Sequence, residues 1–107
     1  MGEAVIQRDE RRRIVGLTIQ SGGMSTPARA SAVTLLRAVA ESLTDYLHVT
    51  VESSFADEMY LEIDRGDQHL DREIDAVLAT MGSGLRIVER EYPAELMVHD
   101  VTVGVEV

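Results

Sequence analysis

The sequence predicts an α+β domain with a mostly antiparallel five-stranded sheet and two long amphipathic helices packed on one of its faces. Apolar and polar residues alternate in five short segments, as strands with one buried face require. Apolar residues recur every three or four positions in two longer segments, which is the spacing of amphipathic helices. These segments follow one another in the order β-β-α-β-β-α-β, and the short polar stretches between neighbouring strands favour hairpins.

The predicted strands form two hairpins and a final single strand. The first hairpin joins residues 4–8 to residues 14–20 through a polar turn at 9–12. The second joins 48–53 to 59–63 through a turn at 54–57. The last strand starts near Glu95 and carries alternating valines at positions 101, 103, 105 and 107. Since half of the side chains in these strands are polar, the second sheet face is either solvated or covered by another copy.

The first helix is predicted from Pro27, directly after the cap residue Thr26, to about Tyr46. The second is predicted from about Leu70 to Tyr92, where the following proline ends it.

The apolar pattern of the second helix passes through Gly82 and Gly84 without losing phase. A glycine costs about 1 kcal/mol relative to alanine inside a helix. We therefore expect a close approach of the first helix, or of a partner, at these glycines.

Length and composition limit the possible functions. The 107 residues form a single predicted domain, 1–107, and 45% of them are hydrophobic, so the core must be mainly aliphatic. The absence of cysteine excludes disulfides, thiolate metal sites and cysteine nucleophiles. A net charge of −9 disfavours nucleic acid and favours a basic partner. Without a signal-like start or an apolar run of about 20 residues, we expect a cytoplasmic protein that does not contact membranes.

Two charged clusters have ordinary structural interpretations. The arginines at 11–13 are expected in a solvated hairpin turn, with a binding patch as the alternative. The acids of the second cluster do not have the spacing of a calcium loop, so no metal is expected there. A solvated turn and an acid-rich helix start explain them better. These acids are Asp64, Asp67, Asp71, Glu73 and Asp75.

Four segments, in order along nearly the whole chain, resemble the ribosomal-processing cysteine protease family. Residues 13–19 resemble that family's second strand, and residues 30–36 resemble the start of its first helix, rich in small residues. The Tyr-Leu-Glu-Ile strand at 60–63 and the segment 84–93, which ends in Tyr-Pro, complete the set.

The resemblance implies a homodimeric peptidase without a cofactor that removes an N-terminal extension from a protein of the large ribosomal subunit. In the family a cysteine lies in the first turn of the first helix, where the helix N-terminus stabilises a thiolate. A histidine at the end of the preceding strand activates that cysteine.

The sequence departs from the family at both catalytic positions. The histidine position corresponds to Gly22 or Gly23, and the cysteine position to Ala30 or Arg29. The intervening loop is also shorter than in the family. The sequence therefore predicts no catalytic residue, and an inactive, ribosome-associated homologue that binds a ribosomal protein or a basic peptide. The candidate binding loop comprises Ser21, Gly22, Gly23, Met24, Ser25 and Thr26.

Two alternatives remain open at this point. A hydrolase could use Ser21 or Ser25 as a replacement nucleophile, provided that a histidine base lies within reach. The histidines are at positions 48, 69 and 99, none of them near this loop in sequence. The second alternative is a structural homodimer of unknown role.

Overall fold

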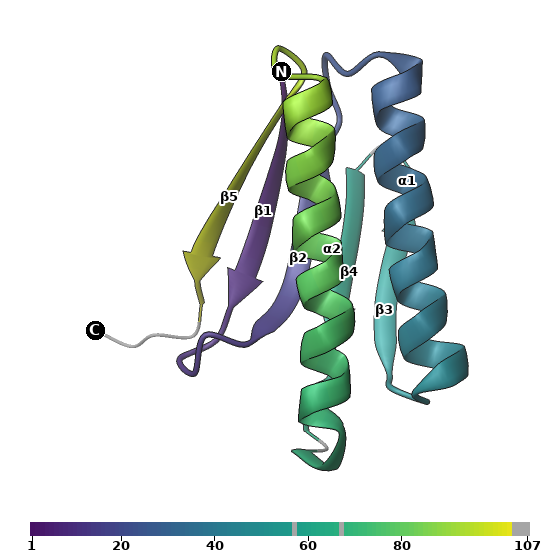
Figure 1. Ribbon diagram of the computed structural model, residues 1–107, viewed down its shortest axis with the longest axis vertical. Coiled ribbons are helices and arrows are strands. Elements are labelled where there is room, and N and C mark those ends of the chain that lie inside the picture. Colours follow the sequence, from purple (N-terminus) through teal and green to yellow (C-terminus); the bar gives the residue numbers. More distant parts are fainter. Residues whose placement is uncertain (57, 67, 104–107) are drawn as a thin grey trace.

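The computed structural model describes residues 1–56, 58–66 and 68–103, with the side chain of residue 68 excepted, and it confirms the predicted fold class. Two long helices lie side by side, antiparallel, on one face of a five-stranded sheet (Figure 1). The main elements in chain order are β1 Gly2–Arg8, β2 Ile14–Gln20, α1 Thr26–Glu41, β3 Val51–Phe55, β4 Glu58–Ile63, α2 Asp71–Glu91 and β5 Leu96–Thr102.

The sheet is mixed, with the strand order β3-β4-β2-β1-β5. The β1–β2, β2–β4 and β3–β4 pairs are antiparallel, as expected from the hairpins, whereas β5 runs parallel to β1. This parallel pair arises because α2 carries the chain back to the end of the sheet where β1 begins. There the Gly2 amide donates to the Glu95 carbonyl over 2.8 Å.

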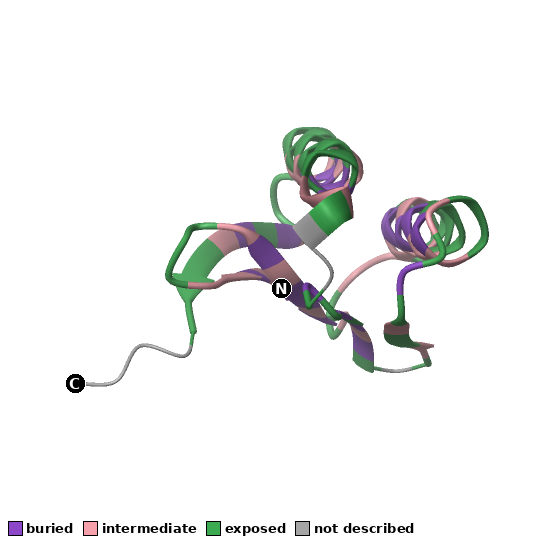
Figure 2. Ribbon diagram, turned by 90° about the horizontal axis from the view of Figure 1, so that it is seen from below, coloured by how far each residue is buried: buried purple, intermediate pink, exposed green. Residues whose placement is uncertain are grey.

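The core fills the space between the sheet and the two helices (Figure 2). Alternate strand residues point toward the helices, and both helices of the described part of the chain lie on that one face. Among the residues whose burial is described, twelve large side chains are almost completely buried: Ile6, Leu17, Ile19, Leu36, Leu43, Met59, Leu61, Ile74, Leu78, Met81, Leu85 and Leu96. Within one chain the core is therefore built on a single face of the sheet, as the strand alternation predicts.

Several predicted boundaries were wrong by a few residues. β3 begins at Val51 rather than at His48, because His48 has a φ of 57° and so turns the chain instead of extending it. The strand also continues through Ser54 and Phe55, which pair with β4. α1 ends at Glu41, and a π-helical turn, η1 Ser42–Tyr46, completes the predicted helix. Two of the predicted valines, 105 and 107, lie outside the described residues.

α2 is one continuous helix through both glycines, and only one of them has the expected close neighbour. A Cβ on Gly84 would lie 2.7 Å from a methyl carbon of Leu35 on α1, so this glycine allows the helices to approach. A Cβ on Gly82 would instead meet its nearest heavy atom, in Ile6, at an ordinary 3.9 Å. The close approach therefore explains Gly84 but not Gly82.

Gly82→Ala should stabilise the protein. The new methyl group has room, and alanine is favoured over glycine inside a helix. We expect the free energy of unfolding to rise by about 0.5–1 kcal/mol, measured by urea denaturation. A decrease would show that the backbone at this position needs a glycine for a reason other than space.

Candidate functional site

The candidate loop connects β2 to α1 at the end of the molecule where β1 begins (Figure 1). Ser25 is the N-cap of α1, and its hydroxyl oxygen accepts from the Ala28 amide at 3.4 Å. Thr26, predicted as the cap, is instead the first helical residue. The Ser25 amide donates to the Glu95 carboxylate, 2.5 Å away, which joins the loop to the residue before β5.

The middle of the loop folds back over the start of β1. The Met24 amide donates to the Ser21 carbonyl over 3.0 Å, which closes a tight turn. Gly23 has a φ of 84°, and a Cβ on it would lie 2.9 Å from the Met1 nitrogen. A Cβ on Gly22 would meet nothing within 4 Å. Of the two positions matched to the family's histidine, only 22 therefore has room for a side chain.

Arg29 connects this loop to the β3–β4 turn. Its Nη2 donates to the Ala56 carbonyl over 2.6 Å, and its Nε donates to the Ser21 hydroxyl over 3.5 Å. The neighbouring Ala30 is exposed. At the two positions matched to the family's thiol, the chain thus has a guanidinium, which is always protonated and cannot attack a carbonyl, and a methyl group.

The histidines give no support to a serine nucleophile at Ser25. His48 and His69 lie beyond the C-terminal end of α1 and just before α2, both at the opposite end of the helix layer. A 16-residue helix separates them from Ser25, a length of about 24 Å. His99 lies on β5, where its Nε2 is 3.5 Å from the Glu3 carboxylate. The Ser25 hydroxyl already makes hydrogen bonds with the Ala28 amide, as the helix cap, and with Glu95.

Hydrogen bonds from the Ser25 hydroxyl and amide lower the pKa of Glu95 below its ordinary value of 4.5. Because the pKa of this carboxyl is lower in the folded chain, the ionised form stabilises the loop at pH values above its ordinary pKa. The contribution is lost as the pH falls through the folded-state pKa.

We therefore expect acid to loosen the loop before it unfolds the protein. The hydrogen-exchange protection factor of the Ser25 amide should fall as the pH is lowered below about 4.5, the ordinary pKa of this carboxyl, while amides in β1 keep theirs. Glu95→Gln, which keeps an acceptor but cannot titrate, should remove the pH dependence. A protection factor equally pH-dependent in that variant would contradict the assignment.

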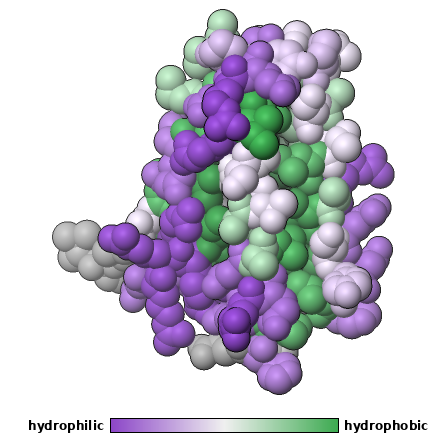
Figure 3. Space-filling view, viewed as in Figure 1, coloured by the Kyte–Doolittle hydropathy of each residue, from purple (hydrophilic) through white to green (hydrophobic). Residues whose placement is uncertain are grey.

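A shallow groove lies on the exposed side of α1, next to the loop. Its lining combines small and apolar side chains with one cation: Met24, Thr26, Arg29, Ala30, Val33 and Thr34. From the helix side, hydrophobic side chains gather along the junction of α1 and α2 (Figure 3). Among the residues that the structure describes, the lining of this groove includes no histidine and no carboxylate.

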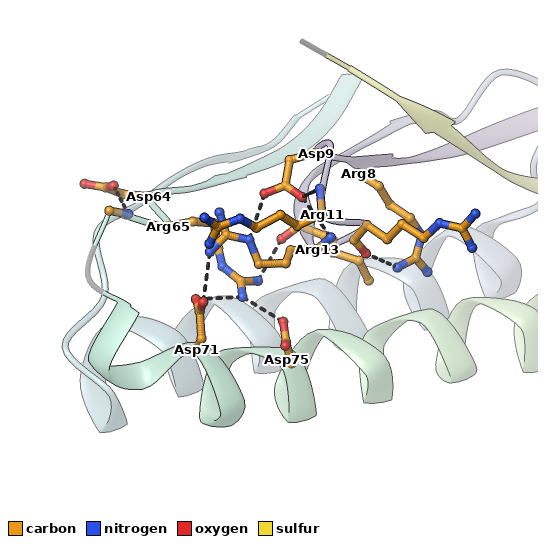
Figure 4. A network of polar contacts seen from close by, with 11 residues as sticks. Arg8, Asp9, Arg11, Arg13, Asp64, Arg65, Asp71 and Asp75 are labelled. Carbon is orange, nitrogen blue, oxygen red and sulfur yellow. Dashed lines mark hydrogen bonds and ion pairs between the residues drawn. The ribbon is translucent and has the colours of Figure 1, made fainter. Parts of the chain in front are cut away.

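Two residues of the acidic cluster, Asp71 and Asp75 on α2, form ion pairs with arginines (Figure 4). Arg65 has only 4% of its side chain exposed, and its Nη2 lies 3.0 Å from Asp71 and 2.7 Å from Asp75. Its Nη1 donates to the Ile14 carbonyl over 3.0 Å. Arg13 also pairs with Asp71, at 2.9 Å. The predicted acid-rich start of α2 is confirmed by Asp71 and Glu73, whereas the ion pairs of Asp71 and Asp75 with arginines were not predicted.

The other members of the charged clusters are placed as follows. Glu73 is exposed, Asp64 accepts from the Gly66 amide over 2.9 Å, and Asp67 lies outside the described residues. The turn at 9–12 is confirmed, with Asp9 accepting from the amides of Arg11 and Arg13 over 2.9 Å. Hydrogen bonding from Arg65, followed by Arg13, lowers the pKa of Asp71.

Within the described part of the chain, no acidic or histidine group is arranged to hold a metal ion, and no helix is long and apolar enough to cross a membrane.

No protein-family model and no curated protein sequence matches the chain. Several solved structures do match the chain in fold. The ribosomal processing protease Prp from Staphylococcus aureus, in complex with a substrate peptide, superposes with a TM-score of 0.79 at 14% identity, covering 94% of this chain and 100% of Prp. The same protease with a covalently linked product peptide gives a TM-score of 0.80 at 12% identity over 94% and 100% of the two chains. SMU.848 from Streptococcus mutans gives 0.74 at 15% identity, covering 95% of each chain.

The chain has the fold of the ribosomal processing protease. The likeness extends over nearly the whole length of both chains, which agrees with the resemblance read from the sequence. At these identities it shows the shared fold alone. What the site does must therefore be argued from this chain's own residues.

Proposed function

We propose that this chain is a pseudoenzyme with the processing-protease fold, which binds a ribosomal protein or another basic peptide without cleaving it. The observation that carries the proposal is the replacement of both catalytic groups: Arg29 and Ala30 at the thiol positions, and Gly22 and Gly23 at the imidazole positions. Arg29 also anchors the loop through its bond to Ala56. Peptide hydrolysis through a covalent intermediate needs an activated nucleophile and a base, and this loop provides neither.

Binding is supported by the open groove beside α1 and by the charge of the chain. The groove is a concave surface beside the start of α1. The family resemblance matches this position to the catalytic cysteine of the processing proteases. A net charge of −9 attracts basic segments, which are characteristic of proteins that contact ribosomal RNA. Homodimer formation, which the resemblance also implies, remains a prediction that sedimentation at micromolar concentration can check.

Two arginine substitutions on α1 test the groove. Ala30→Arg places a long cation in the groove, whereas Ala38→Arg adds the same side chain at an exposed position further along the helix. With the N-terminal extension of a large-subunit ribosomal protein as a fluorescent peptide, we expect Ala30→Arg to weaken binding about tenfold or more, an effect of about 1.4 kcal/mol.

Ala38→Arg should change the affinity by less than about twofold, because it alters the net charge equally without entering the groove. Equal losses in the two variants would assign the effect to charge alone and would contradict binding in the groove.

A further inference from the structure

The sheet face opposite the helices carries an ordered pattern of charge. Seen along the strands, Figure 2 shows both helices on one side and none on the other. The residues on this second face fall into three rows that cross the strands in register. One row is Glu58, Gln20, Glu3 and Met97; the next is Ser54, Tyr60, Thr18, Val5 and His99; the third is Glu52, Glu62, Gly16, Gln7 and Val101.

The two outer rows are acidic, and the central row has no acidic side chain. Each outer row has two glutamates, and all four are exposed. Strand residues advance about 3.3 Å each, so the outer rows lie about 13 Å apart, with the half-buried Tyr60 and Val5 between them. In an extended polypeptide, this distance separates side chains that are four residues apart and point to the same side.

The glutamates of the third row face each other and have no cationic partner among the described residues. Glu52 and Glu62 are direct cross-strand partners, and like charges in that arrangement destabilise a sheet. Among the described residues, neither of them nor Glu58 is in an ion pair, although arginines elsewhere pair with Asp9, Asp71, Asp75 and Asp100. Glu52 and Glu62 are also among the residues that line a shallow hollow, together with Asp64.

We propose that this sheet face is a docking surface for an extended, arginine- or lysine-rich segment of a partner protein, with one cation held between Glu52 and Glu62. Charge complementarity selects this occupant. Nucleic acid is repelled by the carboxylates, and a second copy would bring the same glutamate rows against one another. The proposal goes beyond the function proposed above, because the surface lies on the other side of the sheet from the α1 groove.

The probe for this surface is a ten-residue peptide of alternating arginine and serine, with a glutamine–serine peptide as its neutral counterpart. Glu52→Gln combined with Glu62→Gln removes two charges while keeping the side-chain shape. We expect the basic peptide to bind this variant about tenfold more weakly than the wild-type chain, and the wild-type affinity to fall as salt is raised. The neutral peptide should not bind.

Glu41→Gln combined with Glu91→Gln is the matched control, since both residues are exposed on the helices and the net charge changes equally. This control should bind like the wild type. In an Ala30→Arg background, Glu52→Gln combined with Glu62→Gln should cause the same fold loss of probe binding, which separates this surface from the groove. The Glu52/Glu62 variant should melt no lower than the wild type, because a repulsive pair is removed.

Equal weakening in the two double variants would overturn the proposal. So would a concentration-dependent dimer that strengthens when Glu52 and Glu62 are neutralised, since that result would identify a second copy as the occupant.

Discussion

Arg65→Met is expected to lower the free energy of unfolding by about 2–4 kcal/mol. Methionine keeps the buried stem of the side chain but removes the guanidinium that bonds the Ile14 carbonyl, Asp71 and Asp75. That group fastens the start of β2 and the first turns of α2 to the end of β4. Without the guanidinium, the buried Ile14 carbonyl loses its hydrogen-bond donor. The Asp75 carboxylate is half exposed and can be hydrated instead. The loss of stability is therefore smaller than for a fully buried ion pair.

Urea denaturation at neutral pH measures this effect, and Arg72→Met provides the control. Arg72 is exposed on the same turn of α2, so its replacement should change the free energy of unfolding by no more than about 0.5 kcal/mol. Equal losses in the two variants would show that the buried network does not hold these three elements together.

Gly84→Val should destabilise the protein by about 1–3 kcal/mol. The valine Cβ would lie 2.7 and 2.9 Å from the two methyl carbons of Leu35, and its own methyl groups would extend further toward α1. The two helices must then separate or Leu35 must leave its rotamer, and either change disturbs the core beneath them.

The same substitution at Gly82 is the control for helix propensity. A Cβ on Gly82 would lie 3.9 Å from its nearest heavy atom, in Ile6. Gly82→Val should therefore lower the free energy of unfolding by at least about 1 kcal/mol less than Gly84→Val does. If both valines had the same effect in urea denaturation, close packing of α1 on α2 would not be the reason for Gly84.

The long-range contacts explain which parts of the fold could be predicted from the sequence. The hairpin of β1 and β2 and the whole of α2 follow from local periodicity, which needs only neighbouring residues. The parallel pairing of β5 with β1 joins residues some 90 positions apart, and the left-handed turn at His48 has no local glycine to signal it. Neither could be read from spacing.

For the candidate site, too, the local features were predicted and the long-range contacts were not. Its location between β2 and α1 was predicted, because the glycines at 22 and 23 end the strand pattern and Thr26 with Pro27 indicates a helix start, although the cap is Ser25. The contacts that hold it were not, since Glu95 and Ala56 come from distant segments. The burial of Arg65 was missed for a related reason: an arginine directly after a strand normally points to solvent, and only the meeting of β2, β4 and α2 encloses it.

Mass spectrometry of a peptide incubation tests the absence of catalysis most directly. The full chain is mixed at equimolar concentration with the N-terminal extension of a large-subunit ribosomal protein, and the peptide is followed for a day at neutral pH. We expect the peptide to be bound and to keep its full mass throughout. A cleavage product that accumulates in proportion to the protein concentration, and disappears when Ser21 or Ser25 is replaced by alanine, would contradict the proposed function.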